Sequence, residues 1–179
     1  MKTVFQHIFK FFCNLYFHNR LLVCKNHIAV VLLLYLIYGK CKRTEEILRK
    51  LGYDERTIEL GKIAGYLHDI GNCVNRVDHA HTGAILAYNI LKEMGMSAEE
   101  RTEIMMAIGN HDENTGTAVS NISAALILAD KSDVHRDRVV NTNMSTFDIH
   151  DRVNYAVTNA DLIMNEKERK VTLNLTIDT

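Results

Sequence analysis

Histidines and aspartates, the side chains that bind divalent cations, stand at the ends of several apolar segments of this chain. They are His68, Asp69, His79, His111 and Asp130. Imidazole and carboxylate ligands without thiolates suit Mn, Fe, Zn, Co or Mg, and the residue types do not select among these metals. Neighbouring helical residues point about 100° apart, so His68 and Asp69 are not a chelate by themselves. We expect Asp130 to complete their site.

A cation held by these residues would bring hydrolytic chemistry. It lowers the pKa of a bound water toward neutrality, and two cations can hold both the attacking and the leaving oxygen of a phosphoester. Asp69 is the candidate catalytic residue, because it would bridge or orient the water. Nearby cations and amides could hold a phosphate, although each also fits an ordinary solvated residue: Asn72, Asn75, Arg76, Lys131, Arg136 and Arg138.

Short helices with recognisable ends are expected to position these residues. Asp54 can cap a helix whose apolar positions lead to His68. Gly61 and Gly65 weaken this helix by about 1 kcal/mol each relative to Ala, a cost that is tolerated where a neighbouring helix approaches closely. Ser97 and Glu100 form a capping box at the start of another helix. The helices expected besides that of Asp54 cover residues 44–51, 79–94, 98–111 and 122–130.

The last residues change from helical to strand periodicity. Apolar and polar residues alternate over 171–177, a turn is expected over 166–169, and the partner strand includes residues 162–164. The predicted fold class is therefore mainly α, a helical bundle with a small C-terminal β-hairpin.

Four stretches, YLHDIGN, HAHTGA, AIGNHDE and ALILADKSD, together resemble the HD-domain superfamily of metal-dependent phosphohydrolases over about 95 residues. The resemblance implies an HD-type helical bundle in which His68, Asp69 and Asp130 bind metal. His79 and His111 fall on the histidines of members that bind a second metal. We therefore expect one or two divalent cations per chain; with one metal, those two histidines would bind phosphate or cap helices.

The superfamily has a further histidine ligand ahead of the H-D pair. His27 is the nearest candidate, 41 residues before His68, whereas the resemblance places the ligand near Leu36. We predict that His27 is a poor ligand and that the site lacks this one. With no proline, the chain also lacks the G-Y-P triplet of the cyclic-dinucleotide phosphodiesterases of the superfamily.

The composition changes sharply near residue 44. Residues 1–44 hold seven Lys and Arg, no Asp or Glu, and five of the six Phe. We predict a divergent basic and apolar segment over 1–43, an HD-type helical domain over 44–160 and a β-hairpin over 161–179. We interpret the first segment as a replaced or out-of-frame start, and the hairpin as truncated.

Composition excludes some classes of protein. A net charge of -1 gives no reason to expect nucleic acid, and the apolar run Ile28 to Tyr38 is shorter than the roughly 20 residues that span a membrane. The four Cys contain no C-x-x-C pair, which fits a reducing cytoplasm. The partner expected is a small phosphorylated substrate, and a homo-oligomer stays open.

The function predicted is metal-dependent hydrolysis of a phosphomonoester or phosphodiester with a nucleotide-like substrate. One alternative is a catalytically impaired HD-type module that binds metal or nucleotide for regulation. The other is a purely structural helical protein, which does not require so many ligand-type residues at helix ends.

Overall fold

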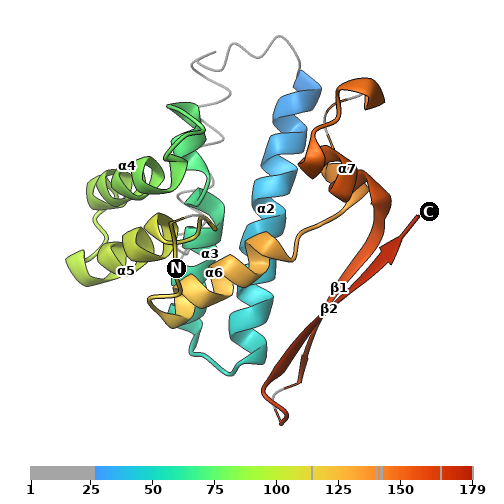
Figure 1. Ribbon diagram of the computed structural model, residues 1–179. Helices are drawn as coiled ribbons and strands as arrows, with labels where there is room; N and C mark the ends of the chain where they lie inside the picture. Colours follow the sequence, from blue (N-terminus) through green and yellow to red (C-terminus); the bar gives the residue numbers. More distant parts are fainter. Residues whose placement is uncertain (1–26, 114, 140, 142, 166, 179) are drawn as a thin grey trace.

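The computed structural model describes residues 27–178 apart from 114, 140, 142 and 166, with side chains described from residue 38 onward. Figure 1 shows a helical body with a two-stranded hairpin along one side, which confirms the predicted fold class. In chain order the elements are α2 (His27–Lys50), α3 (Glu55–Leu67), η1 (Ile70–Cys73), α4 (His79–Glu93), α5 (Ala98–Gly109), α6 (Asn121–Lys131), η2 (Arg136–Arg138), η3 (Met144–Thr146), α7 (Ile149–Ala156), β1 (Val157–Asn165) and β2 (Lys170–Ile177).

The longest of the described helices, α2, packs against both α3 and α6 (Figure 1). It runs through residues 43 and 44 without a break, so the boundary predicted from composition falls inside one helix. A change in composition does not end a helix; Gly52 does, with a φ of +76° that suits glycine. Among the described residues, none of the helices is both long enough and apolar enough to cross a membrane.

The prediction that another helix approaches Gly61 and Gly65 is confirmed. A Cβ at Gly61 would lie 2.3 Å from Leu48 Cδ1, and a Cβ at Gly65 would lie 3.0 Å from Cys41 Cα. Gly65 therefore lets α3 pack directly on the backbone of α2, and Gly61 makes room for the side chain of Leu48. Their cost in helix propensity is offset by burial of the apolar faces of both helices.

The helix predicted over residues 44–51 is the last part of α2, but the predicted helix starts at Asp54 and Ser97 are present. The side chain of Asp54 accepts hydrogen bonds from the backbone N–H groups of Arg56 and Thr57 at the start of α3. Ser97 accepts from the N–H of Glu100 at the start of α5. Such caps satisfy N–H groups that have no partner within the helix.

Two clusters of buried apolar side chains hold the helices together. The first lies among α3, α4, α5 and α6, and its fully buried members include Leu67, Leu91, Ile104, Ile108 and Leu126. The second lies among α2, α3 and α6 and is built from Ile47, Leu48, Ile58, Ala125 and Ala129. Each large side chain buried in this way contributes roughly 1.5–3 kcal/mol, so the ends of these helices are fixed in position.

The C-terminal hairpin packs against the second cluster. β1 and β2 pair antiparallel, with Leu162 opposite Leu173 and Met164 opposite Val171. Leu162 and Met164 contact the cluster from β1. β1 begins at Val157, four residues before the predicted start of the hairpin, because the strand follows α7 directly.

Candidate metal centre

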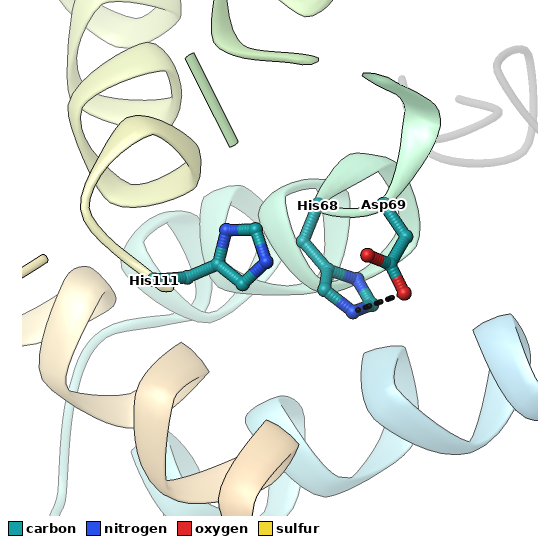
Figure 2. A group of neighbouring side chains, drawn as sticks. All are labelled: His68, Asp69 and His111. Carbon is teal, nitrogen blue, oxygen red and sulfur yellow. Dashed lines mark ion pairs between the residues drawn. The ribbon is translucent and has the colours of Figure 1, made fainter. Parts of the chain in front are cut away.

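His68, Asp69 and His111 form a group in which one ligand atom from each residue lies within 4.8 Å of the others. Figure 2 shows the carboxylate of Asp69 beside the ring of His68, with the ring of His111 next to them. His68 directly follows α3, Asp69 directly precedes η1, and His111 lies just beyond α5. The first core cluster fixes α3 and α5, so these side chains meet at a rigid place.

His79 and Asp130 lie beside this group. His79 opens α4, and its Nε2 lies 3.4 Å from Asp69 Oδ1. Asp130 stands in the last turn of α6, with Oδ1 3.7 Å from His68 Nε2. The ring of His111 lies 5.1 Å, between centroids, from those of both His68 and His79. The structure therefore brings together all five residues predicted to bind metal.

The three imidazole rings are held in the same way. The Nδ1 atoms of His68, His79 and His111 lie 2.9, 3.1 and 2.6 Å from the backbone carbonyl oxygen three residues earlier, that of Gly65, Arg76 and Ile108 respectively. A carbonyl oxygen only accepts, so Nδ1 carries the hydrogen and each neutral ring keeps its lone pair on Nε2. Bonds of this kind to backbone carbonyls orient metal-binding histidines.

His68 shows that the cluster favours a positive charge. Its Nε2 is buried and makes no hydrogen bond within the described part of the chain, although Asp69 Oδ2 lies 3.3 Å away. Burial opposes a charged ring, yet the carboxylates of Asp69 and Asp130 raise the pKa of His68 to about 9. A proton or a metal ion at Nε2 would balance the negative charge of these two carboxylates. Three imidazoles and two carboxylates fit a borderline or hard divalent cation.

The two carboxylates stay ionised. Burial opposes their charge, but the nearby His68 holds the pKa of both Asp69 and Asp130 far below the usual range. Burial also lowers the pKa of His111, which keeps that ring neutral. Asn72, predicted to bind substrate, donates a hydrogen bond of 2.8 Å to Asp69 Oδ1 and so orients this carboxylate.

Two lysines contact Asp130, and reasoning from the sequence missed one of them. Lys40 Nζ lies 2.6 Å from Oδ1, and Lys131 Nζ lies 2.9 Å from Oδ2. Lys40 belongs to α2, 90 residues before Asp130. A separation of this length leaves no local pattern by which the pair could be recognised.

The cluster opens into a cavity of about 660 Å³. Asp69, His79, His111 and Asp130 lie on its inner wall. Other residues of the lining are charged. Three are cationic, Arg76, Lys131 and Arg138, and two are acidic, Asp112 and Glu113. The remaining wall comes mainly from α7, with Ile149, His150, Val153 and Asn154. Reasoning from the sequence did not predict α7, which is short and has no buried residue.

Of the predicted substrate-binding residues, Asn75 is not among those that line the cavity, and neither is Arg136. Its guanidinium pairs with Asp178 at 2.9 Å and lies over the ring of Tyr155. Arg138 lines the cavity instead. Both belong to the 3₁₀ turn η2, where three residues complete a turn, so residues two apart point in different directions.

The other candidate histidines stand apart from the cluster or outside the described side chains. His81 is exposed and pairs with Asp78. The side chains of His27 and Leu36 are not among those described. Asp112, which sequence reasoning passed over, lies with Oδ2 3.7 Å from His79 Nδ1. The sequence does contain a pattern that indicates Asp112, because His111 and Asp112 form a second H-D pair.

Comparison with known families matches residues 37–140, more than half of the chain, to the HD domain. No curated protein matches the chain. Among solved structures there is also no match. The matched segment contains all five residues of the metal centre and also Lys40, whereas α7 and the hairpin follow it. On the family match and the geometry of this centre, the chain belongs to the HD domain family, whose members are metal-dependent phosphohydrolases.

Proposed function

We propose that this chain hydrolyses a small, nucleotide-like phosphomonoester or phosphodiester with the help of one or two divalent cations. The observation that carries the proposal is that His68, Asp69, His79, His111 and Asp130 lie together, and that all of them except His68 line a charged cavity. A bound cation supplies a Lewis acid for phosphoryl oxygens and lowers the pKa of water toward neutrality.

Asp69 is the proposed catalytic residue. Its carboxylate lies between His68 and His79, and the amide of Asn72 fixes Oδ1. Because its pKa lies far below the usual range, Asp69 is ionised at neutral pH. It can therefore bind metal through one oxygen, and accept a hydrogen bond from the attacking water through the other.

Three cationic side chains of the cavity, Arg76, Lys131 and Arg138, are proposed to bind the phosphate. The side chains of Arg76 and Lys131 are 75% and 41% exposed, so an incoming anion can reach them. A guanidinium can bind two phosphate oxygens at once, whereas an ammonium acts as a point charge. Together they would neutralise the substrate and position it over Asp69.

The wall formed by α7 is proposed to bind the rest of the substrate. Ile149 and Val153 present apolar surface to the cavity, and Asn154 adds an amide that both donates and accepts hydrogen bonds. An apolar wall with a few polar groups suits a flat, partly polar group such as a nucleoside. This feature supports a nucleotide-like substrate over inorganic phosphate compounds.

A regulatory module that binds metal or nucleotide without turnover is the second candidate. The observation that favours it is the buried ammonium of Lys40, 2.6 Å from Asp130 Oδ1. A fixed positive charge at this oxygen opposes binding of a metal ion there.

The test is a panel of p-nitrophenyl phosphate, bis-p-nitrophenyl phosphate and nucleoside mono-, di- and triphosphates, each with Mn, Mg, Co, Fe or Zn. Metal content is measured on the same samples. Turnover that is lost in Asp69→Asn but kept in Arg136→Ala supports the hydrolase, since Arg136 lies outside the cavity. Bound metal without turnover supports the module, and the lack of both contradicts each candidate.

A further inference from the structure

Lys40 is a charged residue in a buried position, with its side chain 3% exposed. Its Nζ lies 2.6 Å from Asp130 Oδ1, 2.9 Å from the backbone oxygen of Asp130 and 3.2 Å from Asp133 Oδ2. The first two contacts are hydrogen bonds and the third is an ion pair, so the ammonium of Lys40 is held by α6 and the residues that follow it. The C-terminal end of α6 thus binds a cation, and this cation is the ammonium group of Lys40 in α2.

The oxygen that Lys40 contacts is the one that faces the metal centre. Asp130 Oδ1 lies 3.7 Å from His68 Nε2, while Oδ2 contacts Lys131 instead. Lys131 is 41% exposed and can move into solvent, but Lys40 is enclosed. A metal ion that binds Asp130 Oδ1 together with His68 Nε2 must share this oxygen with the ammonium of Lys40 or displace it.

We propose that Lys40 is an internal cation that competes with the divalent metal for Asp130. This inference rests on the proposed function, because it concerns the affinity of that same metal centre. Like charges a few ångströms apart repel strongly in a buried site. Lys40 therefore weakens metal binding on the Asp130 side, and leaves the side of Asp69 and His79 as the tighter one.

Another cation of α2, Arg43, shows what a purely structural role for Lys40 would be. Arg43 also reaches from α2 to the end of α6, where it donates a 2.6 Å hydrogen bond to the backbone oxygen of Ser132. Cations are favoured at this end by the helix dipole. If Lys40 did no more than this, its loss would lower stability and leave metal affinity unchanged. Arg43 is therefore the matched control.

The experiment compares Mn²⁺ binding by isothermal titration calorimetry in the wild type, Lys40→Met and Arg43→Met. Methionine keeps the length and apolar character of the lysine stem but removes the charge. We expect Lys40→Met to bind Mn²⁺ at least about tenfold more tightly than the wild type, and Arg43→Met to stay within about twofold. Without metal, Lys40→Met should melt at a lower temperature, and Mn²⁺ should raise its melting temperature more than it does that of the wild type.

If Lys40→Met does not fold without metal, Lys40→Gln provides the same comparison, because its amide can still donate a hydrogen bond to Asp130. Mn²⁺ affinity that is equal to or weaker than that of the wild type in the folded variant would overturn the role of Lys40 and leave the metal centre standing. Lack of Mn²⁺ binding in the wild type and in both Lys40 variants would overturn the metal centre, and this inference with it.

Discussion

The stability of the metal-free protein should fall as the pH rises from about 6.5 to above 9, because the buried ring of His68 loses its proton over this interval. Burial opposes the charged ring, but Asp69 and Asp130 raise the pKa of His68 to about 9, from 6.5 in an unstructured chain. The native state thus binds this proton more tightly than the unfolded state. The resulting stability is complete below pH 6.5 and is lost as the pH rises through 9.

The size of the effect follows from the two pKa values of His68. A rise from 6.5 to about 9 corresponds to roughly 3 kcal/mol in the free energy of unfolding, since one pKa unit is worth about 1.4 kcal/mol. A domain of this kind has only about 5–15 kcal/mol in total. The change should therefore be large enough to measure in a single denaturation series.

The assay is urea denaturation followed by circular dichroism in EDTA, at pH 6.5, 7.5, 8.5 and 9.5. His68→Gln is the control, because glutamine fits a polar site but does not take up a proton. The wild type should lose stability over this series relative to His68→Gln. Saturating Mn²⁺ should remove the slope, because the metal then occupies the lone pair of Nε2. Equal slopes for the two proteins in EDTA would refute the reasoning.

Three substitutions test the site by other means. Asp69→Asn should weaken Mn²⁺ binding by at least about 100-fold, and abolish any turnover, while the circular dichroism spectrum stays native; turnover at the wild-type level would contradict the role of Asp69. His79→Ala should lower the Mn²⁺ content measured by mass spectrometry, whereas His81→Ala should not, because His81 pairs with Asp78 at the surface; equal metal content would place His79 outside the centre. Gly71→Ala should lower the free energy of unfolding by about 1–3 kcal/mol in urea denaturation, because its Cβ would lie 2.0 Å from the backbone oxygen of His79. Gly39→Ala is the control and should not lower it, since a Cβ there has no neighbouring atom within 4 Å. An unchanged free energy of unfolding in Gly71→Ala would show that α4 can shift freely.

Much of the helical fold could be predicted because its signals are local. The cap at Asp54, the N-cap at Ser97 and the close approach at Gly61 are each encoded within a few residues, and all three are present, although the carboxylate of Glu100 pairs with Arg56. Strand alternation likewise predicted β2. The start of β1 was missed by four residues, since α7 passes directly into this strand and no turn residue marks the change.

The positions of the candidate metal ligands were predictable for a related reason. Each of its residues follows or opens an apolar segment, so its position at a helix end could be inferred without knowing how the helices pack. The family resemblance then indicated that these residues come together in one site. The same reasoning did not find Lys40, whose partner is 90 residues away and whose surroundings differ in composition from the rest of the chain. It also did not find the wall at α7, whose role depends on tertiary packing.

The charges of the centre explain why Lys40 bears on function. The carboxylates of Asp69 and Asp130 favour positive charge. Besides the exposed Lys131, two enclosed groups of the described chain supply it: a proton on His68 and the ammonium of Lys40. A divalent cation must compete with both. Raising the pH removes the proton of His68, whereas Lys40 is buried and is held by two hydrogen bonds to Asp130 and an ion pair with Asp133. We therefore expect metal affinity at the proposed centre, and with it the choice between a hydrolase and a binding module, to depend largely on the balance of charge at Asp130, because that is the carboxylate that Lys40 contacts.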